Sequence, residues 1–192
     1  IISTTIMNTE LKERLMLLAE RYETPAFIVE DPIRIPHRYH SQTDVEISAL
    51  VTSWIATGNR KAIIRSADRI DCAIFKNAPY QYIMSKEWRM YAGQKGSFYR
   101  YYSFDDFYLL CDTLYTVYSR KPTLEDYLYE SFDTLSPLQR LQSVFGHING
   151  MPEMSSTSEA KKMCMFLRWM IRRDSCVDFG LWQRFHPREL IV

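Results

Sequence analysis

Glycine is scarce in this sequence of 192 residues, occurring six times, and alternating runs of β-branched residues are rare. Because such runs, separated by turn residues, mark β-sheet proteins, their scarcity indicates a helical protein. The four cysteines are widely spaced without a CxxC pair, which argues against a zinc or iron–sulfur site and is typical of reduced cytoplasmic proteins. We find no signal peptide and no apolar run of transmembrane length. We therefore expect a cytoplasmic protein with no metal, no other cofactor and no membrane segment.

A large net charge is also lacking, because 24 lysines and arginines are balanced by 23 aspartates and glutamates. The formal net charge is +1, so binding to nucleic acid requires cations that are segregated along the chain. Such segregation exists: carboxylates dominate residues 105–133, and cations dominate the section before them. Those cations are Arg60, Lys61, Arg65, Arg69, Lys76, Lys86, Arg89, Lys95 and Arg100.

Apolar residues make up 46% of the chain and aromatic residues 14%, values that indicate a folded core rich in ring contacts. Helical spacing predicts helices over residues 10–22, 43–59, 60–75, 103–118, 124–131 and 136–150, and a short helix over 177–185. Residues 31–40 contain two prolines and are expected to form an extended or turning linker. Its histidines, His37 and His40, have no third ligand nearby and do not predict a metal site. The sequence thus predicts one compact all-α domain over residues 1–192.

Capping residues give the expected helix starts. The expected N-caps are Ser103 for the helix over residues 103–118, Thr123 for the helix over 124–131 and Ser136 for the helix over 136–150. Thr43 or Asp44 is expected to cap the helix that ends at Gly58-Asn59. If Thr43 is the cap, Glu46 takes the partner position of a capping box.

One amphipathic stretch, residues 161–173, carries cations and a tryptophan on the same side. At about 100° per residue, one arc holds Met163, Cys164, Phe166, Leu167, Met170 and Ile171. The other arc holds Lys161, Lys162, Arg168, Arg172 and Arg173, with Met165 and Trp169 between the two. Five cations beside an indole are typical of a surface that binds a polyanion and stacks a flat ring. An ordinary amphipathic helix, with a solvated basic side and a packed tryptophan, explains the same periodicity.

Several blocks of the sequence stand out together. The early blocks are Asp31-Pro32-Ile33, Pro36-His37-Arg38, Asp44-x-Glu46-Ile47, Gly58-Asn59-Arg60 and Phe98-x-Arg100-Tyr101. The late blocks are Ala160-Lys161-Lys162, Phe166-Leu167-Arg168-Trp169-Met170 and Val177-Asp178-Phe179-Gly180-Leu181-Trp182. In these blocks the chain resembles an uncharacterised conserved bacterial family, which is itself similar to the helix-hairpin-helix DNA glycosylases of base-excision repair.

The resemblance implies a two-lobed helical fold whose cleft binds DNA and receives an everted base. It also implies that Lys161 is the amine that attacks the sugar carbon, with support from an aspartate further along the chain. In the family that aspartate follows Val192, so we expect the sequence to be truncated at its C-terminus. A nucleophilic lysine needs a lowered pKa, which Lys162, Arg168 and Arg172 are expected to provide. The glycine-rich hairpin that precedes this helix in glycosylases is absent here.

Three functions are compatible with these observations. The first is a DNA glycosylase or lyase with Lys161 as nucleophile, in which Lys162, Arg168, Trp169, Arg172 and Arg173 contact the nucleic acid. In that function Trp54, Trp88 or Trp169 stacks on the extruded base. The second is a non-catalytic nucleic-acid-binding module. The third is a helical scaffold for protein contacts, whose arginines pair with carboxylates such as Asp174 or Asp178. The oligomeric state stays open.

Overall fold

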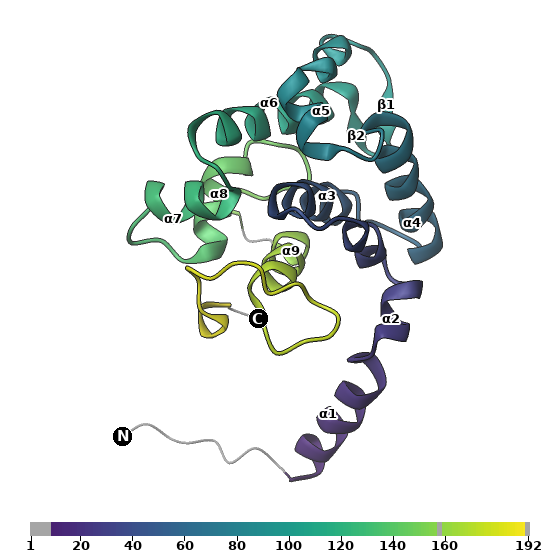
Figure 1. Cartoon of the computed structure of the whole chain (residues 1–192), viewed down its shortest axis with the longest axis vertical. Coiled ribbons are helices and arrows are strands. Elements are labelled where there is room, and N and C mark those ends of the chain that lie inside the picture. The colour runs from purple at the N-terminus through teal and green to yellow at the C-terminus, as the bar shows by residue number, and fades with distance from the viewer. Residues whose placement is uncertain (1–8, 157–158, 191–192) are drawn as a thin grey trace.

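Helices make up most of the structure, a computed structural model that describes residues 9–156 and 159–190 (Figure 1). The α-helices are α1 (Thr9–Tyr22), α2 (Pro25–Glu30), α3 (Gln42–Trp54), α4 (Arg60–Arg69), α5 (Pro79–Ser85), α6 (Phe104–Arg120), α7 (Leu124–Ser131), α8 (Pro137–Phe145) and α9 (Lys161–Ile171). Turns of 3-10 helix cover Pro32–Arg34, Pro36–Arg38, Glu87–Tyr91 and Pro187–Glu189, and a π-helical turn covers Ile70–Ile74. Within the described ranges, β structure is limited to a hairpin of β1 (Ser97–Tyr99) and β2 (Tyr102–Ser103). The predicted all-α fold is confirmed.

Short-range capping places the starts of α6, α7 and α8. The side chain of Ser103 accepts a hydrogen bond from the backbone N–H of Asp106 at the start of α6. Thr123 and Ser136 cap α7 and α8 in the same way. Each cap satisfies a backbone N–H that the helix itself leaves unpaired, which stabilises the helix by about 1 kcal/mol. These three predicted caps are confirmed.

The predicted cap of α3 is wrong. Ser41 caps this helix, because its Oγ accepts a hydrogen bond from the backbone N–H of Asp44 at 3.2 Å. Thr43 and Asp44 therefore lie inside the first turn of α3. Glu46 takes no part in a capping box, and its side chain is fully buried in the core.

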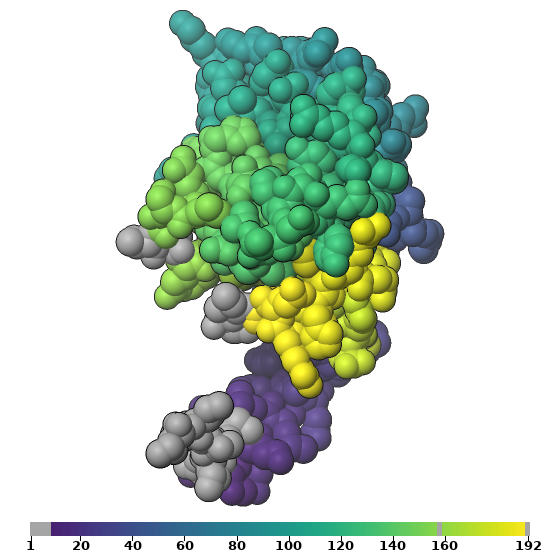
Figure 2. Space-filling model, turned by 90° about the vertical axis from the view of Figure 1, so that its left-hand side faces the viewer, coloured from purple at the N-terminus to yellow at the C-terminus, as the bar shows by residue number. Residues whose placement is uncertain are grey.

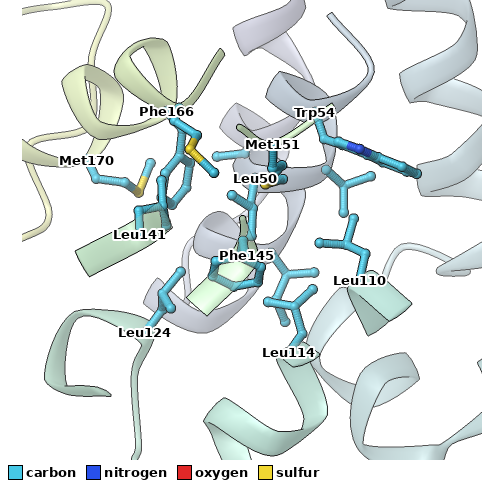
Figure 3. Packing of buried hydrophobic residues seen from close by; sticks show 14 of the residues in the cluster. Leu50, Trp54, Leu110, Leu114, Leu124, Leu141, Phe145, Met151, Phe166 and Met170 are labelled. Atoms are coloured by element: carbon cyan, nitrogen blue, oxygen red, sulfur yellow. The ribbon is translucent and has the colours of Figure 1, made fainter. Parts of the chain in front are cut away.

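The core lies where α3, α6, α8 and α9 meet (Figure 3). Their contributions include Leu50 and Trp54 from α3, Leu110 and Leu114 from α6, Leu141 and Phe145 from α8, and Phe166 and Met170 from α9. The inner arc of α9 is covered, as the periodicity predicts, except at Cys164, which is half-buried and lies on the other side of the helix. Burial of each such side chain stabilises the fold by about 2 kcal/mol. The opposite side of α9 is thereby fixed in position against the rest of the molecule.

The helix predicted over residues 177–185 does not form. The backbone N–H groups of Phe179 and Gly180 donate to the carbonyl of Trp169 at 2.9 and 3.1 Å, and Trp182 donates to Met170 at 2.9 Å. The last carbonyls of a helix lack partners within it, so this segment completes the hydrogen bonds of α9 instead of folding on itself. Gly180 adopts φ +58°, and a Cβ there would lie 2.7 Å from the Cα of Arg173. The close approach to α9 therefore needs glycine at this position.

Two other segments form helical turns that the sequence pattern predicts only in part. Residues 31–40 turn, as expected, because their prolines begin two consecutive 3-10 turns rather than interrupting a helix. Ile33 and Ile35 in these turns are buried. The predicted helix over residues 60–75 is α4 followed directly by the π-helical turn.

The first helix, α1, projects away from the rest of the molecule (Figures 1 and 2). It has no buried residue, and its leucines are exposed although they have helical spacing. Across the described ranges, every helix is too short or too polar to cross a membrane.

Candidate functional site

The outer side of α9 forms one wall of a cavity of about 370 Å³. Lys161, Cys164, Met165 and Arg168 line this wall, because their spacing of three and four residues places them on one side of the helix. The facing residues are Phe27, Asp31, Pro137, Leu138, Glu189 and Leu190. Segments from the beginning, middle and end of the chain thus enclose one space, which is within the usual size range of small-molecule sites. We call it the α9 cavity.

The α9 cavity combines apolar walls with carboxylate acceptors. One oxygen of Asp31 accepts a hydrogen bond from the N–H of Ile33 at 3.1 Å, and Glu189 accepts one from the N–H of His186 at 2.5 Å. The second oxygen of Asp31 lies 4.0 Å from Nε of Arg60, and that of Glu189 makes no hydrogen bond within the described residues. Trp169 also lines the cavity, and its buried indole N–H has no hydrogen-bond partner in the described part of the chain. Apolar walls with a few polar groups suit a planar heterocycle that carries N–H donors.

Lys161 lies at the edge of this cavity and is highly exposed. Its side chain is 84% accessible, and its Nζ lies 2.8 Å from a carboxylate oxygen of Glu159. The hydrogen bond and the charge of Glu159 raise the pKa of Lys161. The expectation of a lowered pKa is therefore wrong, because the nearest charged group is an anion and the cations of α9 are engaged elsewhere.

Lys162 is directed toward the end of α3. Its Nζ donates to the carbonyl of Trp54 at 3.1 Å and to the hydroxyl of Tyr102, and it lies 4.9 Å from the centre of the Tyr102 ring. A cation at the C-terminus of a helix is stabilised by the helix dipole. This geometry gives Lys162 a role in holding α9 against α3, whereas its contact with nucleic acid stays a prediction.

Arg168 and Arg172 share the buried carboxylate of Asp178. The two guanidinium groups lie 3.3 and 2.7 Å from its oxygens, as ion pairs without the alignment of a hydrogen bond. Burial raises the pKa of Asp178, whereas the two arginines act in the opposite direction. Arg172 also pairs with Glu23, which accepts a hydrogen bond from Ser175. This is the arrangement that the scaffold hypothesis predicts for the arginines of α9.

Arg168 differs from Arg172 in that 47% of its side chain is accessible and it lines the α9 cavity. Arg173 donates to the carbonyls of Trp182, Gln183 and Phe185 at 3.1, 2.9 and 3.0 Å, so it holds the segment that follows α9. Contacts of Arg172 and Arg173 with a polyanion stay predictions, although the structure gives both guanidinium groups intramolecular partners.

The three candidate stacking residues are all buried. The indole N–H of Trp54 donates to the carbonyl of Asn149, and that of Trp88 donates to the carbonyl of Ile83. Of the three, only Trp169 lines the α9 cavity. Stacking of Trp54 or Trp88 on a ligand would need rearrangement of the core, and stacking by any of the three stays a prediction.

Sequence reasoning missed the residues that face α9 across the cavity. Asp31 belongs to a block that the resemblance selects, but the block gave no sign of its position opposite α9. No sequence pattern indicated that Phe27, Leu138 and Glu189 lie at the cavity, because each of them belongs to a different helix or turn. Among the described residues, no group of three or more histidine, cysteine, aspartate or glutamate side chains is arranged to hold a metal ion. The aspartate expected beyond Val192 lies outside the described residues.

Comparison with known proteins identifies a family to which the chain is similar. A family model described as "Protein of unknown function (DUF2400)" matches residues 31–192, which include the α9 cavity except for Phe27. No curated protein and no solved structure matches the chain.

Proposed function

The chain belongs to the DUF2400 family, whose function is unknown, and we propose that it binds DNA and accepts an unpaired base in the α9 cavity. The α9 cavity is the observation that carries this proposal. Phe27, Met165 and Leu138 offer apolar surfaces to a flat ring, while Asp31 and Glu189 offer acceptors to its amino and imino groups. The resemblance of the sequence blocks to helix-hairpin-helix glycosylases, which stays an expectation beside the family match, points to the same use. A cytoplasmic location belongs to the same proposal, because all four cysteines are free thiols.

Filling the cavity should abolish the recognition of an unpaired base. Stacking of one base is worth about 1–3 kcal/mol, so we expect the protein to prefer a duplex with one bulged base about tenfold over a fully paired duplex. Met165→Trp replaces a flexible thioether by a bulky indole that fills the cavity. It should remove this preference while leaving the affinity for paired duplex unchanged. Fluorescence anisotropy with both duplexes measures the two affinities.

Met90→Trp is the matched control, because Met90 is exposed and does not line the cavity. This variant should retain the preference for the bulged duplex. An equal preference in wild type and Met165→Trp, with both variants folded, would exclude the α9 cavity as the site of the base.

A lyase step is the catalytic form of this proposal, and Lys161 is its candidate nucleophile. The Lys161 amine would attack C1′ of an abasic sugar in its aldehyde form, and loss of water would give an imine. Borohydride reduces that imine to a secondary amine and so links protein and DNA covalently. The position of Lys161 at the cavity supports this role, whereas its raised pKa favours binding without catalysis.

Borohydride trapping on abasic DNA separates catalysis from binding. With a catalytic lysine, Lys161→Ala should abolish trapping while the affinity for DNA changes little. Glu159→Gln should increase trapping near neutral pH, because removal of the anion lowers the pKa of Lys161 and leaves more free amine. Lys76→Ala, a control at another exposed lysine, should leave trapping unchanged. If wild type is not trapped but still binds DNA, the non-catalytic binding function remains.

A further inference from the structure

A second hollow lies on the other side of α2 from the α9 cavity. It has a volume of about 750 Å³ and lies between α2, the first 3-10 turn and the beginning of α4. Its lining includes Val29, Glu30, Arg34, Arg60, Lys61 and Arg65. Four of these six side chains are cations and one is an anion. We call this hollow the α4 groove.

Three of the four cations of the α4 groove have no ion-pair partner within the described residues, and the fourth, Arg60, has a distant one. Lys61 and Arg65 are exposed on successive turns of α4, and neither forms an ion pair or a side-chain hydrogen bond within the described residues. Arg34 donates to the carbonyl of Val29 at 3.0 Å and has no carboxylate partner there. Arg60 is 57% accessible, and its nearest carboxylate, Asp31, is 4.0 Å away.

Other cations of the chain are paired much more closely. Arg38 lies 2.5 and 3.0 Å from Asp68 and Asp71, and Lys76 lies 2.7 Å from Glu87. A cluster of four cations, of which only Arg60 has an ion-pair partner within the described residues, concentrates positive potential in one place on a chain of nearly neutral net charge. The segregation of cations seen in the sequence is therefore expressed on α4, where the charges remain available to an external anion.

The groove and the α9 cavity are neighbours across α2, and Arg60 of the groove reaches two residues of the cavity. The Arg60 guanidinium lies 5.7 Å from the ring of Phe27 and 4.0 Å from Asp31, and both residues line the cavity. In Figure 1, α2 lies below the lower end of α4, between α4 and α1. An anion in the groove would thus lie next to a ligand in the cavity, with only α2 between them.

The basic surface extends beyond the groove to the β1–β2 hairpin. The guanidinium of Arg100, at the turn of this hairpin, packs over Gly58 just before α4. It also lies 5.6 Å from the centre of the Tyr101 ring, and Tyr101 is 74% exposed. Cations beside an exposed ring are typical of surfaces that bind nucleic acid.

We propose that the α4 groove binds backbone phosphates of duplex DNA and supplies most of the electrostatic affinity, in place of the basic arc of α9. This inference rests on the proposed function, because the adjoining α9 cavity would hold a base of the same DNA. Phosphate contacts from the α4 groove would position the protein on the duplex, and the base contact in the α9 cavity would recognise the unpaired base.

The test is the salt dependence of DNA binding in a double variant, Lys61→Ala with Arg65→Ala. Each lost phosphate contact flattens the slope of log affinity against log salt by about 0.9, so the two changes should flatten it by about 1.8. The melting temperature should be nearly unchanged, because neither side chain has a partner to lose. Arg120→Ala removes an exposed helical arginine outside the groove and should leave the slope unchanged.

The outcomes separate this inference from the function on which it rests. If wild type binds DNA and the double variant has the same slope, the α4 groove is not the phosphate site, although the proposed function stands. If Arg168→Ala alone flattens the slope, the phosphates lie on α9. If wild type binds acidic protein but no DNA, both proposals fail.

Discussion

Replacement of Glu46 by alanine is expected to lower the free energy of unfolding by about 4 kcal/mol. The carboxylate of Glu46 is buried and accepts hydrogen bonds from the N–H groups of Leu124 and Glu125, from Tyr118 and from Trp182, at 2.7 to 3.3 Å. The variant leaves these donors buried without an acceptor, and each such group costs about 1–3 kcal/mol. Urea unfolding followed by circular dichroism measures the change.

Glu46→Gln tests why the carboxylate is needed. Burial raises the pKa of Glu46, while the donors around it act in the opposite direction and favour the anion. A glutamine amide has the same shape, but its NH₂ group would face the N–H of Leu124. We therefore expect a loss of about 2 kcal/mol. Glu13→Ala on the exposed α1 should change stability by less than about 0.5 kcal/mol. A Glu46→Gln variant as stable as the wild type would show that these donors do not need a negatively charged acceptor.

Removal of both Arg168 and Arg172 is expected to cost about 3–5 kcal/mol of stability, because it leaves the buried carboxylate of Asp178 without a counter-charge. Arg168→Ala alone should cost much less, since Arg172 remains 2.7 Å from Asp178. Chemical denaturation of the single and double variants gives these values.

The triple variant, in which Asp178→Ala is added, should recover part of the lost stability, because no unpaired charge remains. Arg173→Ala is the matched control. Within residues 9–156 and 159–190, Arg173 donates to carbonyls and forms no ion pair, so its effect should add to that of Asp178→Ala without coupling. Strict additivity between the two arginines and Asp178 would contradict the shared ion pair. An unchanged melting temperature in the double variant would show instead that the arginines are free to bind a polyanion.

Features that depend on neighbouring residues could be predicted from the sequence. Ser103, Thr123 and Ser136 cap their helices through backbone groups three positions away, so local spacing determines them. The buried arc of α9 follows from periodicity alone. The cap of α3 was missed because Glu46 satisfies distant donors on α7 and at Trp182, and no local pattern shows this.

The candidate site depends on contacts between distant segments and was predicted only in part. Periodicity places Lys161 and Arg168 on the outer side of α9, where both line the cavity. It does not show that the segment after α9 turns back and brings Asp178 to the arginines. It also does not show that the α4 groove lies next to the cavity, across α2. Residues 177–185 have a helical pattern, but hydrogen bonds to the end of α9 compete successfully with it.

The affinity of the wild-type protein for duplex DNA, measured between about 50 and 200 mM salt, tests the central claim most directly. Four phosphate contacts, from Arg34, Arg60, Lys61 and Arg65, predict a slope of about −3.6 and a loss of about a hundredfold in affinity over this range. An affinity that does not change with salt, or no binding at the lower salt concentration, would contradict the proposal that this protein binds DNA.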